Sequence, residues 1–172
     1  MDGRTPMPLV LITVGTDHHP FERLVGWIDR WTPPAPVRVV VQYGTAVPPH
    51  TAEGVAFLAP DEFAALLGAA DAVVCSGGPG AIMETRAVGL RPIVVPRRAS
   101  LGEHVDDHQR AFADFMAGRG LVTLADDEPA VRVALDAVVR DRRAYRIDLT
   151  EQKAEGIVRI GTLIDDLVNG AA

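Results

Sequence analysis

Short apolar runs alternate along this chain with longer stretches in which apolar residues recur every three to four positions. The runs have the length and composition of strands that are buried on both faces, as in Val37–Tyr43 and Pro92–Val95. The periodic stretches between them are typical of helices that cross from one parallel strand to the next. The pattern therefore predicts an α/β fold in which a single Rossmann-like parallel sheet is flanked by helices.

The boundaries of the expected elements follow from the apolar runs and from Pro, Asp and Gly at their ends. The predicted strands are Leu9–Val14, Val37–Tyr43, Val55–Leu58, Ala72–Cys75, Pro92–Val95 and Leu121–Leu124. The predicted helices are Phe21–Trp31, Asp61–Ala70, Gly80–Gly89, Glu103–Gly118 and Glu128–Arg142. The rhythm has no break, so residues 1–172 are predicted to form one domain. A further amphipathic helix is predicted over 150–168, which would cover the chain's own sheet or dock on another chain.

Composition narrows the classes of function. A formal net charge of −6 on 172 residues leaves no basic excess for a phosphate backbone, which argues against nucleic acid as the main partner. The single cysteine, Cys75, rules out an internal disulfide or a thiolate zinc cage, and no signal segment opens the sequence, so we expect a cytoplasmic protein. The apolar runs are far shorter than the roughly 18–20 residues of a membrane span, so membrane contact is expected only peripherally or through a partner.

Ligands of α/β sheets bind at the carboxyl ends of the strands, which draws attention to the loop after the first strand. Gly15 and Thr16 could expose backbone N–H groups to an anion there, although a plain strand-to-helix turn with Asp17 as N-cap is an equal alternative. His18 and His19 are adjacent, so they are expected to point apart rather than share a metal ion. These two histidines and Asp17 are the candidates for a catalytic base.

The loop after the fourth strand is rich in glycine. It reads Ser76, Gly77, Gly78, Pro79 and Gly80. Glycines permit close backbone approach and proline suits the first helical position, so free N–H groups and the positive end of a helix would converge on a phosphate. Glu84 lies one helical turn further on and could accept hydrogen bonds from a ribose diol. The alternative is a tight turn followed by a solvent-facing carboxylate.

The loop after the fifth strand is polar and charged. His104 and His108 are spaced as on one helical face, but no third ligand is identifiable, so no metal site is predicted. Directional donors and acceptors suit sugar hydroxyls better, and Asp107, His108 and Gln109 supply them. Arg97 or Arg98 could meet a phosphate.

These three loops resemble those of the donor-binding half of family 28 glycosyltransferases, which have the two-domain GT-B architecture. The resemblance covers roughly residues 9–123 and rests on Thr13–Thr16, on Ser76–Gly80 with Glu84, and on Glu103–Gln109. It is strongest to the small catalytic subunits of two-chain UDP-sugar transferases: the PssE-type exopolysaccharide subunits and the subunit acting on dolichol-linked sugars. The C-terminal domain of MurG is a more distant relative. One departure is Cys75-Ser76, where eukaryotic relatives tend to have Ser-His.

The resemblance implies a metal-independent, inverting transfer of a hexose from a UDP-sugar to a lipid-linked acceptor. The glycine loop would bind diphosphate, Glu84 the ribose, and His108 and Gln109 the sugar hydroxyls, with residues 55–61 near the uracil. No further cofactor is implied. This chain offers only one of the two halves, so a membrane-associated acceptor-binding subunit is the expected partner, and the isolated chain could form a homodimer. The alternatives are a non-catalytic nucleotide-binding module and a related epimerase, the latter disfavoured by length.

Overall fold

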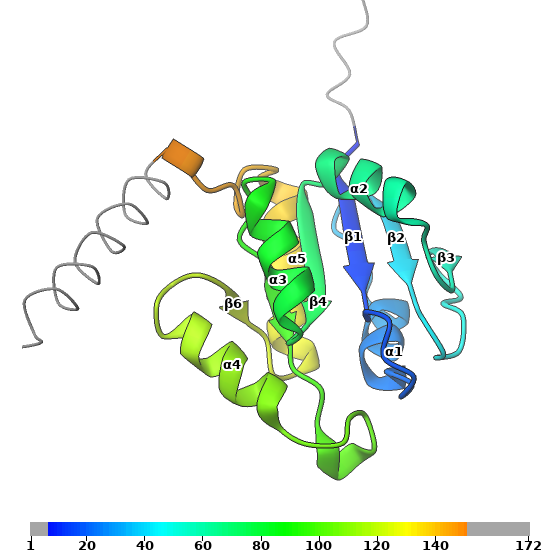
Figure 1. Cartoon of the computed structure of the whole chain (residues 1–172). Helices are drawn as coiled ribbons and strands as arrows, with labels where there is room; N and C mark the ends of the chain where they lie inside the picture. Colours follow the sequence, from blue (N-terminus) through cyan, green and yellow to red (C-terminus); the bar gives the residue numbers. More distant parts are fainter. Residues whose placement is uncertain (1–6, 151–172) are drawn as a thin grey trace, which may run out of the picture.

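A computed structural model of the protein describes residues 7–150. Six strands form one sheet in the order β3-β2-β1-β4-β5-β6, and every pair is parallel. Helices cover both faces of this sheet (Figure 1). The chain runs outward from β1 to one edge and then returns to build the other side from β4. This arrangement confirms the predicted Rossmann-like fold.

The elements follow the predicted order closely. The strands are β1 (Leu9–Thr13), β2 (Arg38–Gln42), β3 (Glu53–Val55), β4 (Ala72–Ser76), β5 (Ile93–Val95) and β6 (Thr123–Leu124). The helices are α1 (Glu22–Arg30), α2 (Pro60–Ala69), α3 (Pro79–Ala87), α4 (His108–Ala117) and α5 (Glu128–Arg140), with a short 3-10 turn at Ala99–Leu101.

Two apolar layers hold the helices to the sheet. On one face, Val10 and Ile12 of β1 pack with Leu24 of α1 and Leu135 of α5. On the other face, Leu11 of the same strand shares a cluster with residues of α2, α3 and α4, including Ile82. Successive side chains of a strand point to opposite faces, so the continuous apolar run in β1 serves both layers.

The third strand lies earlier than predicted. β3 is Glu53–Val55, whereas the apolar residues 56–58 follow it in a loop. An edge strand pairs with one neighbour only, so its outer side does not have to be apolar, and Glu53 pairs instead with Arg38 of β2. The shift moves Leu58 beyond the carboxyl end of the sheet.

The fourth helix is shorter than predicted. It begins at His108, and the stretch from Gly102 to Asp107 is a loop. Gly102 ends the 3-10 turn with a φ of 69°, and the buried carboxylate of Glu103 accepts a hydrogen bond from the backbone N–H of Arg98. These contacts fold the segment back on β5 and prevent a helix from starting at Glu103.

Beyond α5 the chain returns to the loop between α3 and β5. Arg91 N–H donates to Tyr145 O, and Leu90 forms an isolated antiparallel bridge with Arg146. The helix predicted over 150–168 lies, apart from its first residue, outside the described residues. Within 7–150, no helix is both long and apolar enough to cross a bilayer.

Candidate functional site

A cleft of about 330 Å³ lies at the carboxyl edge of the sheet, beside the point where strand order reverses between β1 and β4. The predicted site residues that line it come from the β1–α1 loop and from α3: Gly15, Thr16, Gly80 and Glu84. The other lining residues are Thr13, Gln42, Leu58, Pro60, Phe63 and Ala81. Segments that are far apart in sequence therefore meet in one cleft, as expected for the edge of a parallel sheet.

Two buried polar side chains of the cleft were not among the predicted site residues. Thr13 Oγ1 donates to Gln42 Oε1 over 3.0 Å and accepts a hydrogen bond from Gly15 N–H at 3.2 Å. Thr13 ends β1, and Gln42 is its register partner at the end of β2. A polar residue that follows at least three apolar residues at the carboxyl end of β1 and of β2 was the signal that could have identified them.

The glycines of the β4–α3 loop have different roles. A Cβ on Gly77 would lie 2.7 Å from the backbone oxygen of Gln109, so this glycine is required by packing against α4. A Cβ on Gly80 would meet no atom within 4 Å, and Gly80 lines the cleft. The open side of the loop therefore lies at Gly80, whereas Gly77 is buried.

The helix after this loop begins as predicted. Pro79 occupies the first turn of α3, and Gly78 is its N-cap. No acidic residue lies in that first turn, so nothing offsets the positive end of the helix dipole. Glu84 is exposed on the same helix and lines the same cleft. A carboxylate and a helix N-terminus with free N–H groups thus lie along one wall.

Arg97 has a structural role, contrary to its proposed contact with phosphate. Its guanidinium is fully buried and donates to the carbonyls of Val14 at 2.7 Å, His19 at 2.7 Å and Glu103 at 2.9 Å. Burial lowers the pKa of Arg97 below the usual arginine value, while the nearby carboxylates of Asp17 and Glu103 oppose that effect. The side chain ties the β1–α1 loop to the β5–α4 loop.

Arg98, Asp107 and Gln109 lie at different depths. Arg98 Nη2 donates to the carbonyl of Asp126, and Asp107 Oδ1 accepts from Ala99 N–H at 3.0 Å. Gln109 is 6% exposed, and its Oε1 has no hydrogen-bond partner among the described residues. None of the three lines the cleft, so the structure does not bring them into contact with Glu84.

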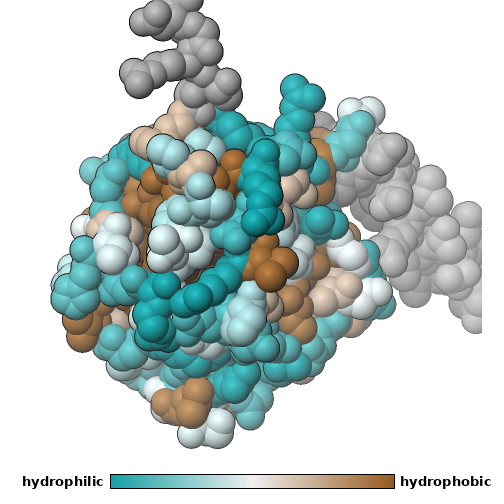
Figure 2. Space-filling view, turned by 180° about the vertical axis from the view of Figure 1, so that it is seen from behind, coloured by the Kyte–Doolittle hydropathy of each residue, from teal (hydrophilic) through white to brown (hydrophobic). Residues whose placement is uncertain are grey.

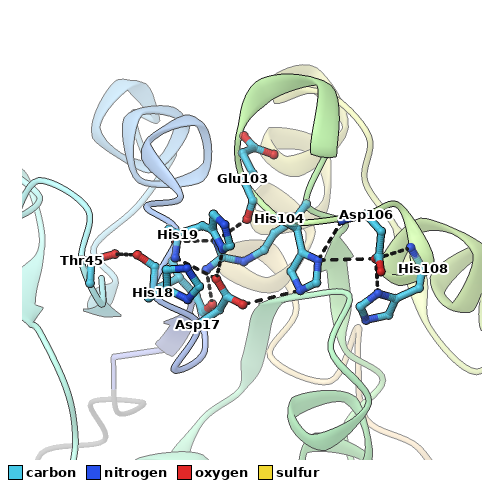
Figure 3. A network of polar contacts seen from close by, with 10 residues as sticks. Asp17, His18, His19, Thr45, Glu103, His104, Asp106 and His108 are labelled. Atoms are coloured by element: carbon cyan, nitrogen blue, oxygen red, sulfur yellow. Dashed lines mark hydrogen bonds and ion pairs between the residues drawn. The ribbon is translucent and has the colours of Figure 1, made fainter.

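Histidine and aspartate side chains form a row that joins the β1–α1 and β5–α4 loops (Figure 3). Asp17 Oδ1 lies 2.6 Å from His19 Nδ1, and Asp17 Oδ2 lies 3.5 Å from His104 Nε2. His104 Nδ1 is in turn 3.5 Å from Asp106 Oδ1, which also contacts His108 Nδ1. The row therefore runs from one loop to the other across the carboxyl edge of the sheet.

Two predictions about this row were wrong, and the alternative that Asp17 caps α1 is excluded as well. The rings of His18 and His19 do not point apart, because their centroids are 4.0 Å from each other in a loop that is neither helix nor strand. His104 and His108 do not share a helical face, since only His108 lies in α4. Asp17 is not the N-cap of α1, a position held by Phe21. Instead, Asp17 accepts hydrogen bonds from the backbone and the ring of His19.

The pKa values of the two aspartates in the row, Asp17 and Asp106, are both lowered. Burial acts to raise the pKa of Asp17, but hydrogen bonds from the backbone and ring of His19 outweigh it, so the pKa lies below the usual aspartate value. The pKa of Asp106 is lowered chiefly by the backbone N–H of His108 and then by its ring. Both carboxylates are therefore charged at neutral pH.

A larger hollow of about 490 Å³ lies elsewhere, between α1 and strands β2 and β3. It is lined by Met7, Trp31, Val37, Arg38 and His50 among others. Seen from behind, hydrophobic side chains form its floor beneath a mostly hydrophilic rim (Figure 2). Met7 and Val37 precede their strands, so this hollow opens at the opposite edge from the cleft and is not the candidate site.

The sequence matches the family described as the glycosyltransferase family 28 C-terminal domain over residues 9–156. The match takes in every described strand and helix, together with both loops that flank the cleft. This chain belongs to that family. Membership agrees with the resemblance drawn from the three loops and identifies the chain as a glycosyltransferase domain.

A similar protein of known name is much longer than the segment that it shares with this chain. Over 115 residues the chain is 39% identical to a UDP-N-acetylglucosamine–N-acetylmuramyl-(pentapeptide) pyrophosphoryl-undecaprenol N-acetylglucosamine transferase of Desulforudis audaxviator. The aligned segment is 64% of this chain but only 30% of the relative. This glycosyltransferase family 28 domain thus spans about a third of that enzyme.

Solved glycosyltransferase structures share the fold. MurG from Acinetobacter baumannii aligns with a TM-score of 0.55 at 18% identity, covering 91% of this chain and 51% of that one. CalG4, the calicheamicin glycosyltransferase, aligns with a TM-score of 0.57 at 19% identity, covering 84% of this chain and 38% of that one. The family 28 domain therefore has the architecture of the C-terminal, Rossmann-like half of a GT-B enzyme.

Proposed function

We propose that this domain binds a UDP-sugar in the cleft between β1, β2 and α3 and serves as the donor half of a hexosyltransferase. The observation that carries the proposal is the meeting of Gly15, Thr16, Gly80 and Glu84 in one cleft of about 330 Å³. Its volume lies at the lower end of the range for small-molecule sites. The name of the Desulforudis relative, a UDP-N-acetylglucosamine-dependent transferase, supports a uridine-diphosphate donor.

Each part of the donor would face cleft residues whose chemistry suits it. The diphosphate would lie over Gly78 and Gly80, where the free N–H groups of α3 supply positive charge. The Glu84 carboxylate would accept hydrogen bonds from the ribose diol. Leu58, Pro60 and Phe63 would form the apolar side for the uracil base, in the region where the family resemblance places it. Thr16 and Ser76 would add hydroxyl donors.

The transferred sugar would extend from the diphosphate toward the start of α4. Gln109 Oε1 is buried without a partner among residues 7–150, and such an acceptor is costly unless a ligand supplies a donor. His108 is exposed at the first position of the helix, and Asp107 precedes it. Arg98 Nη2 donates to the Asp126 carbonyl, and the other N–H groups of this guanidinium would donate to a phosphate oxygen.

Transfer would proceed without a metal on the diphosphate and with inversion. The acceptor oxygen forms a bond to the anomeric carbon as the bond to the diphosphate breaks, UDP leaves, and a base takes the hydroxyl proton. Backbone N–H groups of α3 would stabilise the charge that develops on UDP. His18, His19 and Asp17 are the candidates for the base in this chain, and the alternative is a residue on the partner.

The acceptor side is proposed to come from another chain. A GT-B site closes between two halves, and residues 9–156 match the family of the C-terminal half. We propose a heteromer with a membrane-associated, acceptor-binding subunit that recruits this otherwise cytoplasmic chain for polysaccharide synthesis on a lipid-linked acceptor. Residues 150–168, with Ile157, Ile164 and Leu167, are the proposed contact. A homodimer would be the isolated form.

Isothermal titration of UDP into the purified chain tests donor binding. Glu84→Gln should weaken binding by about 1–3 kcal/mol, the range for hydrogen bonds to a charged group, which is roughly 5- to 150-fold in Kd. Met83→Ala is the matched control, because Met83 is exposed on the same helix but does not line the cleft. Unchanged affinity in Glu84→Gln would remove the ribose assignment, and no binding of UDP by the unaltered chain would remove the donor site.

Transfer itself is tested by adding UDP-sugars and a lipid-linked acceptor to the chain with and without a candidate partner. We expect sugar transfer only with the partner, and capture of the partner should fall when the chain is truncated after Leu149. Robust transfer by the isolated chain would contradict the heteromer. Binding of UDP without transfer under any pairing would favour the non-catalytic nucleotide-binding module.

A further inference from the structure

Two histidines and one aspartate converge in the β5–α4 loop. His104 Nδ1 lies 3.5 Å from Asp106 Oδ1, and His108 Nδ1 contacts the same oxygen. The rings of His104 and His108 meet edge to face with centroids 4.7 Å apart. One ligand atom from each residue lies within 4.8 Å of the other two. Two imidazoles and a carboxylate at such range form the donor set of many transition-metal sites.

We propose that His104, Asp106 and His108 bind a divalent transition-metal ion of the zinc class. Zinc bonds to histidine and carboxylate ligands at about 2.0–2.1 Å, so two ligands of a tetrahedral site lie roughly 3.3–3.4 Å apart. The 3.5 Å between His104 Nδ1 and Asp106 Oδ1 is close to that separation. It is longer than a good N–H···O hydrogen bond, which measures about 2.7–3.2 Å.

The protonation of His104 suits a ligand. Asp106 N–H lies 3.4 Å from His104 Nδ1, which is consistent with a lone pair on Nδ1 and the proton on Nε2. Nε2 faces Asp17 Oδ2 at 3.5 Å. Histidine ligands usually donate their second N–H to a carboxylate, which orients the ring and increases its basicity. Asp17 would hold His104 in this way from the neighbouring loop, as Figure 3 shows.

The ligand types determine the class of ion. Imidazole favours zinc, copper, nickel and cobalt, whereas magnesium and calcium prefer oxygen ligands, so this site is separate from any magnesium effect on the diphosphate. Cys75 cannot compete as a ligand because it is fully buried in β4. Binding through Nδ1 would leave His108 Nε2–H as a donor for a sugar hydroxyl, so both roles of His108 are compatible.

In a second trio, Asp17, His18 and His19, one ligand atom from each residue also lies within 4.8 Å of the other two. Asp17 Oδ1 there already accepts two hydrogen bonds from His19, from the backbone at 2.8 Å and from Nδ1 at 2.6 Å. Asp106 Oδ1 accepts the same two contacts from His108, the backbone N–H at 3.1 Å and the ring Nδ1, so these bonds do not separate the two trios. The β5–α4 loop differs in His104, whose Nδ1 lies 3.5 Å from Asp106 Oδ1 while its Nε2 faces Asp17, and the proposal therefore places the ion there.

The test is titration of Zn²⁺ into the untagged chain by calorimetry, with Co²⁺ absorption reporting coordination geometry. We expect one ion per chain and affinity that increases from pH 6 to pH 8, because binding releases protons from the ligands. His104→Ala and His108→Ala should each weaken binding at least about 100-fold. Asp17→Asn, one shell further out, should weaken it roughly 10- to 100-fold. Thermal melting checks that each variant is folded.

His50→Gln is the matched control, since His50 lines the hollow at the opposite edge of the sheet. Its affinity for Zn²⁺ should equal that of the unaltered chain. Loss of binding in His18→Ala with retention in His108→Ala would move the ion to the second trio and overturn the proposal. No binding tighter than about millimolar, or equal loss in His50→Gln, would also overturn it. None of these readouts depends on UDP binding or on transfer.

Discussion

The Glu103 carboxylate accepts hydrogen bonds from Nε and Nη2 of Arg23 at 2.8 and 2.7 Å, although the two residues are 80 positions apart in sequence. The pair lies between α1 and the β5–α4 loop, and the side chains are 14% and 6% exposed. Phe21 and Trp27 cover the guanidinium, whose carbon is 5.2 and 4.8 Å from their ring centroids. The carboxylate at the start of the Glu103–Gln109 motif is thus a structural group.

Glu103→Gln should therefore destabilise the domain, because it leaves a largely buried guanidinium without its counter-charge. Removal of one partner from a buried ion pair costs about 3–5 kcal/mol. Arg23 keeps a second acceptor, the carbonyl of Pro96, so we expect about 3 kcal/mol. The measurement is urea unfolding at pH 7. Glu53→Gln breaks an exposed Arg38 pair of similar geometry and should cost only about 0–1 kcal/mol. Equal losses in the two variants would contradict this view.

Gly77 and Gly80 should respond differently to alanine. Gly77→Ala drives a methyl group into the backbone of Gln109 and is expected to cost about 1–3 kcal/mol in the free energy of unfolding. Gly80→Ala meets open space within α3, so stability should stay within about 0.5 kcal/mol, whereas UDP binding should weaken on the order of tenfold. Urea unfolding and UDP calorimetry on both variants decide. Reversed effects would mean that Gly77 faces the ligand.

Cys75 should be inert to thiol reagents in the folded protein. Burial raises the pKa of its thiol to about 12, and the side chain is inaccessible in β4. Reaction then requires unfolding, so modification at pH 8 should be at least about 10³-fold slower than in denaturant. Because folding raises this pKa, it favours the neutral thiol. The stability that the neutral thiol contributes is present in full below about pH 9 and is lost as pH rises toward 12. Rapid native labelling would contradict the burial.

Asp17 should contribute to stability at neutral pH and lose that contribution in acid. Its pKa is lowered on folding, so the stabilisation is present above the usual value of 3.8 and is lost as pH falls through the lower folded value. Asp17→Asn should have a lower melting temperature than the unaltered chain at pH 7, and the two curves should converge between about pH 4 and pH 2. Asp61→Asn, an exposed carboxylate on α2, controls for the lost charge. A constant difference at all pH values would refute the assignment.

Donor binding should not depend on added divalent cations, because the proposed diphosphate contacts are the backbone N–H groups of α3 and the guanidinium of Arg98. We expect the Kd of UDP to change less than about twofold between chelator and millimolar Mg²⁺. Loss of binding in chelator and its recovery with Mg²⁺ would show that a metal bridges the diphosphate. The same titration with Zn²⁺ separates this question from the proposed His104 site.

The sheet could be predicted because β1, β4 and β5 are buried along their whole length, as are the last three residues of β2, and burial leaves a continuous apolar signal. The loop after the fourth strand and the helical spacing predicted that Gly80 and Glu84 lie at the carboxyl edge of the sheet, and both line the cleft there. The early start of β3 and the late start of α4 could not be predicted. Each depends on long-range contacts, Arg38 with Glu53 and Glu103 with Arg23, which leave no periodic pattern.

The histidine row shows the same limit. His18 and His19 were judged by the geometry of regular elements, yet they lie in a loop in which His19 N–H donates to the Asp17 carboxylate and His19 O accepts from Arg97. The convergence of His104 with Asp17 joins residues 87 positions apart and has no local signal. Motifs thus indicate which residues carry chemistry, while loop contacts determine which of them meet.

The three carbonyls held by Arg97 have a thermodynamic consequence for ligand binding. Because one buried side chain fixes Val14, His19 and Glu103, the two loops are ordered by folding itself. A donor arriving at the cleft would not have to restrict those backbones, which would otherwise cost about 1–2 kcal/mol for every residue ordered. The heat-capacity change on UDP binding should then correspond to the surface of the nucleotide and cleft alone, with no contribution from coupled folding.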